Sequence, residues 1–354
     1  MRDQFAGKKV LITGGLGFIG STLARRLVEL DAEVLLVDSL IPEYGGNLHN
    51  IAGIEKRVKV NIADVRDLSS MSYLIQNQDY LFNLAGQTSH LDSMQDPYTD
   101  LEINCRAQLS ILEACRKHAP RLKIVYASTR QVYGIPRYLP VDERHLAWPV
   151  DVNGINKLAG EQYHIVYHHA YGIRTCVLRL TNTYGPRMRV KDARQTFLGW
   201  WIRQILEDQE IHVFGDGKQL RDFTYVEDAV EAFLLVAKSE DCDGEIFNVG
   251  GEGPVGLRDV AELLVEINGG GRWATVPFPP DHKVIDIGGY YADDSKIRSK
   301  LNWRPQVSFR EGLARTLRYY REHRQHYWGE TQDPFFGSDK ELSNHPVGSR
   351  DRYR

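Results

Sequence analysis

Short apolar runs rich in β-branched residues alternate with longer amphipathic stretches from the N-terminus to about residue 250. The short runs are typical of strands buried on both faces, and the longer stretches are typical of surface helices. This alternation predicts an α/β fold with a doubly wound parallel sheet covered by helices on both sides. Strands are expected at Lys9–Ile12, Val34–Val37, Val58–Ile62, Tyr80–Leu84, Lys123–Ala127, Thr175–Leu178 and Glu245–Val249, and helices at Ser21–Leu30, Leu101–Lys117, Ile155–Tyr171 and Glu227–Ala237.

The charge balance and the cysteines narrow the class of protein. Lys and Arg number 44 and Asp and Glu 47, a formal net charge of -3, which is not the basic excess typical of a nucleic-acid binder. No apolar run reaches the ~20 residues of a membrane helix, and the first residues lack the apolar stretch of a signal peptide. We expect a cytoplasmic protein without a nucleic-acid or membrane partner, and no pattern indicates a metal site. The cysteines, none in a C-x-x-C pair, suit a reducing compartment: Cys105, Cys115, Cys176 and Cys242.

Three glycines lie between the first expected strand and the first expected helix. Gly14, Gly17 and Gly20 form the pattern G-x-x-G-x-x-G inside TGGLGFIG. Glycines in such a loop permit a tight turn and let the backbone approach a pyrophosphate at the N-terminus of the following helix. Because a strand precedes the loop and a helix follows it, the pattern predicts a Rossmann-type dinucleotide site, with Phe18 and Ile19 beside it.

Two carboxylates follow the next strands. Asp38 comes 18 residues after Gly20, where a carboxylate accepts hydrogen bonds from the ribose hydroxyls of the adenosine half. No Arg or Lys follows Asp38 closely enough to pair with a 2′-phosphate, so NAD is favoured over NADP. Asp64 is either a turn residue or a contact to the adenine edge, and both interpretations stay open. Further cofactor contacts are expected at Val65, Leu84 and Ala85.

The regular alternation is interrupted twice. Residues 183–210 contain a basic and aromatic segment, and residues 251–328 mix helical patterns with the proline-rich stretch VPFPPDHK. We expect these two segments to form a smaller C-terminal α/β domain that binds the substrate. Residues 1–182 and 211–250 then form the larger, NAD-binding domain, and residues 329–354 a polar tail.

Five further motifs, with the glycine loop, carry a resemblance that covers the chain up to about Trp328. The sequence resembles the extended short-chain dehydrogenase/reductase family, in its NAD-dependent nucleotide-sugar epimerase/dehydratase branch. The resemblance implies that bound NAD oxidises a sugar hydroxyl to a ketone and that the hydride is usually returned. It also implies a homodimer through the helices at Leu101–Lys117 and Ile155–Tyr171. The motifs are NLAGQ at Asn83–Gln87, ASTRQVYG at Ala127–Gly134, RLTNTYGP at Arg179–Pro186, FGDGKQLRDFTYVEDA at Phe214–Ala229 and FNVGG at Phe247–Gly251.

The resemblance assigns roles to four residues. Thr129 matches the Ser or Thr that hydrogen-bonds the reacting hydroxyl, and Lys157 matches the lysine that holds the nicotinamide ribose. Asn182 and Arg221 match residues that contact the diphosphate of a nucleotide sugar. Each also has a purely structural interpretation, as a strand-end cap, a turn residue or a partner in a surface ion pair.

A basic cluster followed by two tryptophans begins at Arg187, which we place among the substrate-binding residues. Cations suit a diphosphate and aromatic rings suit a base or a sugar face. A solvated basic loop beside a buried helix is the alternative interpretation. The cluster comprises Arg187, Arg189, Lys191 and Arg194, and the tryptophans are Trp200 and Trp201.

The chain departs from the Tyr-x-x-x-Lys pair of the family. The segment Asn153–Lys157 reads NGINK, so Asn153 stands where the catalytic tyrosine is expected. An amide cannot take up the hydroxyl proton and can only orient a substrate or a water. Three explanations stay open for how the chain works without this tyrosine. In the first, His90 is the base, since imidazole titrates near neutral pH. In the second, a relay through Thr129 and water takes the proton, and in the third the protein binds NAD and a nucleotide sugar without turnover.

The residues after Thr129 bear on the type of reaction. The 4,6-dehydratases of the family carry two acidic residues there, and the decarboxylating relatives a glutamate at the second position. This chain has Arg130 and Gln131, and we place Gln131 among the substrate contacts. By subtraction, the leading hypothesis is an NAD-dependent nucleotide-sugar epimerase with an atypical base. A net NAD-dependent dehydrogenase or dehydratase of nucleotide sugars is the remaining alternative.

Overall fold

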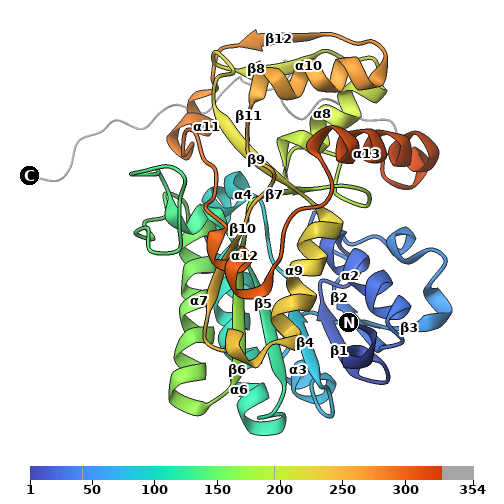
Figure 1. The fold of residues 1–354 in the computed structure, drawn as a ribbon, viewed down its shortest axis with the longest axis vertical. Helices are drawn as coiled ribbons and strands as arrows, with labels where there is room; N and C mark the ends of the chain where they lie inside the picture. The colour runs from blue at the N-terminus through green and yellow to red at the C-terminus, as the bar shows by residue number, and fades with distance from the viewer. Residues whose placement is uncertain (42, 195, 329–354) are drawn as a thin grey trace, which may run out of the picture.

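A seven-stranded parallel sheet forms the centre of the larger domain (Figure 1). The structure is a computed structural model that describes residues 1–41, 43–194 and 196–328. The strand order is β10-β6-β5-β4-β1-β2-β3, and every neighbouring pair is parallel. The doubly wound fold expected from the sequence is therefore confirmed. The strands are β1 (Lys9–Thr13), β2 (Glu33–Asp38), β3 (Val58–Ile62), β4 (Tyr80–Asn83), β5 (Lys123–Thr129), β6 (Arg174–Leu180) and β10 (Ile246–Val249).

Except for the edge strand β3, whose side chains are half-buried or exposed, the strands of this sheet bury side chains on both faces. In β1, Val10 and Ile12 belong to the core beneath two helices, whereas Leu11 belongs to the core on the opposite face. This two-sided burial explains why the strands read as continuous apolar runs. One face is covered by α2 (Phe18–Glu29) and α9 (Val226–Lys238), and the other by α3 (Leu68–Leu74), α6 (Ala107–His118) and α7 (Val152–Tyr171).

The strand order reverses beside β1. From β1 the chain runs outward to β2 and β3 on one side, and then returns to β4 on the other. The loops that follow β1 and β4 therefore diverge from a common crevice at the carboxyl edge of the sheet. Ligands of open α/β sheets bind at such a reversal.

A smaller domain lies at the carboxyl edge of the large sheet (Figure 1). It holds a three-stranded sheet, a parallel strand pair and four helices around its own core, which includes Trp200, Trp201 and Leu317. Its strands are β7 (Asn182–Tyr184), β9 (Leu220–Tyr225) and β11 (Pro254–Gly256) in one sheet, and β8 (Ile211–Phe214) with β12 (Trp273–Val276) in the other. Its helices are α8 (Phe197–Leu206), α10 (Leu257–Asn268), α11 (Pro280–Val284) and α13 (Phe309–His323).

The packing assigns some segments of the chain to a different domain from the one expected from the sequence. Residues 211–250 were expected in the larger domain, but β8 pairs with β12, and Val213 and Phe223 lie in the smaller core. Conversely, Trp303 and the helix α12 (Ser295–Leu301) pack against the larger core. The chain thus crosses between the domains more often than a two-segment division allows. The tail expected at 329–354 lies outside the described residues.

The helix expected over Leu101–Lys117 is two helices joined without a break by a π-helical turn. No helix of the described residues has both the length and the apolar character that crossing a membrane requires. The remaining short elements are α1 (Arg2–Phe5), η1 (Leu48–Ile51), η2 (Glu55–Arg57), α4 (His90–Gln95), α5 (Pro97–Leu101), the π-helical turn η3 (Glu102–Arg106), η4 (Arg130–Tyr133), η5 (Glu240–Cys242) and η6 (Arg324–His326).

Candidate active site

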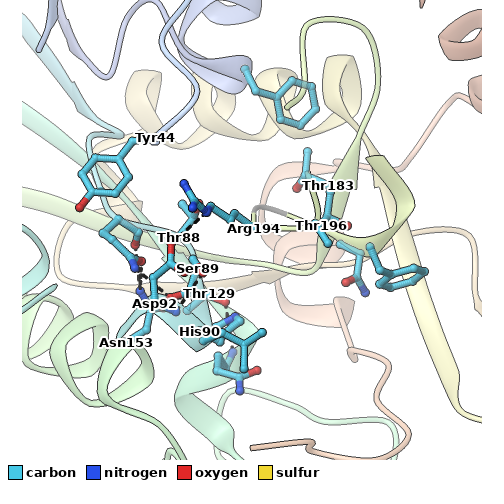
Figure 2. Close-up of a pocket in the computed structure, with 18 of the residues that line it drawn as sticks. Tyr44, Thr88, Ser89, His90, Asp92, Thr129, Asn153, Thr183, Arg194 and Thr196 are labelled. Carbon is cyan, nitrogen blue, oxygen red and sulfur yellow. Dashed lines mark hydrogen bonds and ion pairs between the residues drawn. The ribbon is translucent and has the colours of Figure 1, made fainter. Parts of the chain in front are cut away.

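A cavity of about 1180 Å³ lies between the carboxyl edge of the large sheet and the smaller domain. Gly14, Ala85 and Thr129 line it from the ends of β1, β4 and β5, and Asn182 and Trp200 line it from the smaller domain. Figure 2 shows His90, Thr129 and Asn153 in one part of the cavity, with Thr183 and Thr196 across it. The cavity is large enough for two ligands bound side by side.

The glycine loop forms one end of the cavity. Gly14 has φ +66°, and a Cβ there would lie 3.1 Å from the backbone of Ala85. A Cβ on Gly20 would collide with the carbonyl oxygen of Gly14, so both positions require glycine. The helix α2 begins behind Gly17 with no side-chain cap and no acidic residue in its first turn. Its free N–H groups and positive end are therefore available to an anion.

The two expected carboxylates lie on the same wall but differ in environment. Asp38 accepts hydrogen bonds from the N–H groups of Leu16 (3.0 Å) and Leu40 (2.9 Å), while burial raises the pKa of its carboxyl. Asp64 pairs with Arg66 at 2.6 Å, and this contact lowers the pKa of Asp64. The structure therefore gives Asp64 a structural partner at the cavity edge.

Every residue expected to contact the cofactor lines this cavity. Its wall thus fits a dinucleotide in two respects, because the glycine loop has no room for a Cβ and the first turn of α2 has unused N–H donors. The residues are Gly14, Gly17, Phe18, Ile19, Gly20, Asp38, Asp64, Val65, Leu84, Ala85 and Lys157.

Lys157 is a buried cation on α7. Its Nζ donates to the carbonyl oxygen of Ala127 at 3.2 Å and lies 5.1 Å from the ring centroid of Tyr126. Burial lowers the pKa of Lys157 to about 8. Lys157 lines the cavity, so its ammonium group can donate to a ligand hydroxyl there.

Thr129 ends β5 and lines the cavity. Its Oγ1 accepts a hydrogen bond from the N–H of Gln131 at 3.2 Å and so caps η4. The hydroxyl still has its own proton to donate. The structural role and the expected substrate contact are therefore compatible at this residue.

Asn153 is tied into a buried polar cluster. Its side-chain nitrogen donates to Asp100 Oδ2 at 2.9 Å and to the carbonyl oxygen of Gln87 at 2.8 Å. Asp100 is fully buried and also accepts from the amides of Asn104 (3.1 Å) and Asn156 (2.8 Å). Three amide donors thus satisfy one buried carboxylate. Asn153, at the position where a catalytic tyrosine is expected from the sequence, is thus part of a structural network.

His90 forms a dyad with Asp151. Its Nδ1 lies 3.0 Å from Asp151 Oδ2, a close contact whose angle is not that of a hydrogen bond, and its side chain is 34% exposed whereas that of Asp151 is fully buried. The second cavity-lining partner of Asp151 is Gln131, whose Nε2 donates to the same oxygen at 2.8 Å. Burial raises the pKa of Asp151, but the contact with His90 and the hydrogen bonds from Gly154 and Gln131 together lower it below its ordinary value.

Arg130, Asn182 and Arg221 line the part of the cavity next to the smaller domain. Arg130 Nη2 donates to Asn182 Oδ1 at 3.3 Å, while Arg130 Nη1 is buried without a partner among the described residues. Arg221 contacts Asp286 at 3.4 Å. Burial and the charge of Arg130 lower the pKa of Arg221 to about 10. Two neighbouring guanidinium groups facing one cavity suit a diphosphate.

Arg187 does not reach the cavity. It has φ +73°, donates to Thr22 Oγ1 at 3.3 Å and lies over the ring of Tyr319. The placement of Arg187 among the substrate contacts is therefore not supported by the structure, because its left-handed backbone turns the side chain toward α2 and α13. Of the same cluster, Arg194 does line the cavity and pairs with Asp92 at 3.4 Å.

Comparison with known proteins gives this geometry a context. Residues 10–250 match the NAD dependent epimerase/dehydratase family. The chain belongs to this family. Its relatives within the family include a putative UDP-glucose 4-epimerase of Methanocaldococcus jannaschii, 33% identical over 88% of this chain and 97% of the relative. A UDP-N-acetyl-alpha-D-glucosaminuronate decarboxylase of Bacillus cytotoxicus is 32% identical over 89% of this chain and 98% of its own.

A solved epimerase structure extends the likeness to the fold. The UDP-glucuronic acid 4-epimerase of Bacillus cereus, in complex with UDP-glucuronic acid and NAD, superposes with a TM-score of 0.80. It is 30% identical, and the match covers 89% of this chain and 99% of that chain. The assignment to the NAD-dependent epimerase/dehydratase branch is thus confirmed, with NAD as its cofactor.

Two residues at this site were not expected from the sequence to act in it: Arg130, which lines the cavity, and Asp151, which lies behind the cavity-lining His90 and Gln131. Asp151 appears in the sequence only as an acidic residue before a helix, a position where Asp commonly caps the first turn. Arg130 differs from the acidic residue of dehydratases, but its unpaired nitrogen becomes visible only in the structure. No sequence spacing links His90 to Asp151, because the dyad joins α4 to the start of α7.

Proposed function

We propose that this protein is an NAD-dependent nucleotide-sugar epimerase in which His90 is the general base. The observation that carries the proposal is the position of His90, with the buried Asp151 behind it, in the same cavity as Thr129, Lys157 and the glycine loop. An imidazole with one nitrogen turned to a carboxylate keeps the other as a proton acceptor. This replaces the phenol that Asn153 cannot supply.

Each side chain has a defined task in this scheme. Bound NAD supplies a reversible oxidant that takes up the hydrogen of a sugar C–H bond with its electron pair and gives it back. Thr129 orients the reacting hydroxyl, and His90 takes the hydroxyl proton and returns it. Lys157 holds the nicotinamide ribose. Its positive charge also disfavours the oxidised cofactor, which is itself positively charged. Asn182 and Arg221 hold the diphosphate.

The residues after Thr129 argue against elimination of water and against loss of a carboxylate. Both reactions need a group near the ketone that takes or delivers a second proton. Arg130 and Gln131 cannot do this at neutral pH, and the Gln131 amide already donates to Asp151. Epimerisation needs only that the ketone be presented to the cofactor on its other face.

The decisive measurement is proton NMR of the full chain with NAD and a panel of UDP-, GDP-, CDP- and dTDP-sugars in D₂O. A new anomeric signal supports the proposal. If several sugars bind and none is converted, the protein is a binding protein and the proposal is wrong.

The role of His90 is tested with His90→Gln. Loss of a general base costs roughly 10²–10⁴-fold in kcat, and we expect a loss in this range with NAD affinity preserved. An unchanged kcat would assign the proton transfer to the alternative relay through Thr129 and water.

We further propose a cytoplasmic homodimer. In support, Ile155 and Val166 lie three turns apart on α7 and are each 54% exposed, and Leu101 on α5 adds 40% exposure. The cysteines of the described residues are all free, as in a reducing compartment. Light scattering of the wild type and of Val166→Asp tests the dimer, which the aspartate should dissociate.

A further inference from the structure

We infer that Asp151 is a positioning residue that holds the His90 ring in the tautomer with the proton on Nδ1 and the acceptor nitrogen Nε2 free for the substrate. This inference rests on the proposed function of His90. It assigns a task to a carboxylate that would otherwise count only as a helix cap.

The contacts of Asp151 divide between its two oxygens. Oδ1 accepts from the N–H of Gly154 at 2.6 Å, which caps the first turn of α7. Oδ2 faces His90 Nδ1 at 3.0 Å and accepts from Gln131 Nε2 at 2.8 Å. The cap fixes the carboxylate to the helix, and Gln131 fixes its second oxygen in the direction of the ring.

The ring is fixed from its own side as well. His90 is the first residue of α4, and Ser89 caps that helix by accepting from the N–H of Asp92 at 3.1 Å. The hydroxyl of Ser93 on the same helix accepts from the N–H of Asn153 on α7 at 3.2 Å. A second contact therefore joins the two helices and keeps the backbone that carries the ring close to the backbone that carries the carboxylate.

Electrostatics favours the same arrangement. An ionised carboxylate only accepts hydrogen bonds, so a contact of 3.0 Å is favourable when Nδ1 carries the proton and repulsive when Nδ1 presents its lone pair. Burial raises the pKa of Asp151, but the contact with His90 and the hydrogen bonds from Gly154 N–H and Gln131 Nε2 together bring it below the ordinary value, so the carboxylate is ionised. His90 Nε2 is then left as the acceptor, and in the reaction the O–H bond of the sugar breaks, its electron pair stays on oxygen, and the proton forms a bond to Nε2.

Asp151→Asn tests this inference without removing the cap. Asn caps helices as well as Asp does, so its oxygen stays on Gly154 N–H and its NH₂ group turns to the ring. A donor in that place forces the proton from Nδ1 to Nε2. We expect the ¹⁵N spectrum of the imidazoles to show His90, assigned by its absence in His90→Gln, in the opposite tautomer. We also expect kcat to fall roughly 10²-fold or more with KM little changed, as for loss of a general base.

Asp67→Asn is the matched control. Asp67 caps α3 by accepting from the N–H of Ser69 at 2.9 Å and does not line the cavity. This variant should leave both the His90 spectrum and kcat unchanged. An unaltered His90 tautomer in Asp151→Asn would overturn the inference, and so would an altered tautomer with unchanged kcat.

The spectrum separates this inference from the proposed function. If the wild type converts no nucleotide sugar, the proposed function fails. The tautomer of His90 in the wild type and in Asp151→Asn still decides whether Asp151 holds the ring.

Discussion

At the scale of single residues, Arg130 combines a buried charge with an unused donor. Its Nη1 has no partner among the described residues, and its guanidinium lies 5.4 Å from the ring centroid of Tyr290. Burial lowers the pKa of Arg130, because a cation in a low-dielectric site lacks the solvation it has in water. An anionic ligand would supply the missing acceptor, and the diphosphate is the anion that a nucleotide sugar offers.

We predict that Arg130→Gln weakens the binding of UDP-glucose and leaves the binding of NAD unchanged. A hydrogen bond to a charged group is worth about 1.5–3 kcal/mol, which corresponds to roughly 10–100-fold in Kd. Calorimetric titration of each ligand measures the effect. Lys191→Gln, at an exposed position of the neighbouring loop, is the control. Equal affinity of Arg130→Gln and wild type for UDP-glucose would contradict the prediction.

Residue types in local motifs could be predicted, and contacts between distant residues could not. The glycine loop could be recognised because the glycines that steric exclusion requires all lie within seven consecutive positions, from Gly14 to Gly20. Arg187 was misplaced because a positive φ at a residue other than glycine is not written in the sequence. The cluster around Asp100 is likewise invisible there, since its asparagines read as ordinary helix residues until the fold brings them to one carboxylate.

At the scale of elements, α7 contributes Asn153 and Lys157 to the lining of the cavity and also contains a buried histidine, His164. His164 is fully buried, stacks on Tyr126 with ring centroids 4.4 Å apart, and has its Nδ1 2.7 Å from the carbonyl oxygen of Gly160. Burial lowers the pKa of His164 to about 4 from 6.5, with a smaller contribution from the charge of Lys157. The folded state therefore contains the neutral ring.

The sign of the resulting pH dependence follows from linkage. Between pH 6.5 and about 4 the unfolded chain binds a proton at this residue that the folded chain does not. His164 therefore favours folding fully above pH 6.5 and loses this contribution as the pH falls toward 4. We predict that His164→Phe, which keeps the ring stack, reduces the loss of stability between pH 7 and pH 5.

Urea unfolding at a series of pH values measures this effect. His169→Gln, an exposed position on the same helix, should retain the wild-type slope. If His164→Phe and the wild type lose stability in parallel over this range, His164 is not the group responsible.

At the scale of the whole molecule, the C-terminal segment returns to the larger domain at Trp303. The side chain is 2% exposed, and its Nε1 donates to the carbonyl oxygen of Asp228 at 2.9 Å. Asp228 in turn accepts from the N–H groups of Gln306 and Val307 at 2.9 and 3.1 Å. The segment before α13 is thus fastened to α9, and α13 completes the core of the smaller domain.

We predict that Trp303→Ala lowers the free energy of unfolding by about 3–5 kcal/mol, as for other large buried aromatic side chains. Chemical denaturation of the full chain measures the change. Trp148→Ala, at a side chain that is 70% exposed, should change stability by no more than about 0.5 kcal/mol. If Trp303→Ala and Trp148→Ala unfold at similar denaturant concentrations, the buried Trp303 side chain does not make the predicted contribution to stability.

The strands of the large sheet other than β3 could be predicted because they are buried on both faces and so read as apolar runs, whereas the edge strand β3 alternates apolar and polar residues and is half-buried or exposed. The division into domains could not, since β8 finds its partner β12 some sixty positions further along the chain. Pairings at such separations depend on the whole fold. The same limit applies to the dyad of the active site, whose members come from two helices.

The carboxylate cluster around Asp100 also bears on how this protein can change. Introducing a tyrosine at position 153 removes one of three amide donors from a buried charge and puts a large ring where Asn153 is only 2% exposed. A single substitution of Asn153 by tyrosine is therefore expected to destabilise the fold, because it leaves the buried charge of Asp100 with fewer hydrogen-bond donors and has no space for the larger ring.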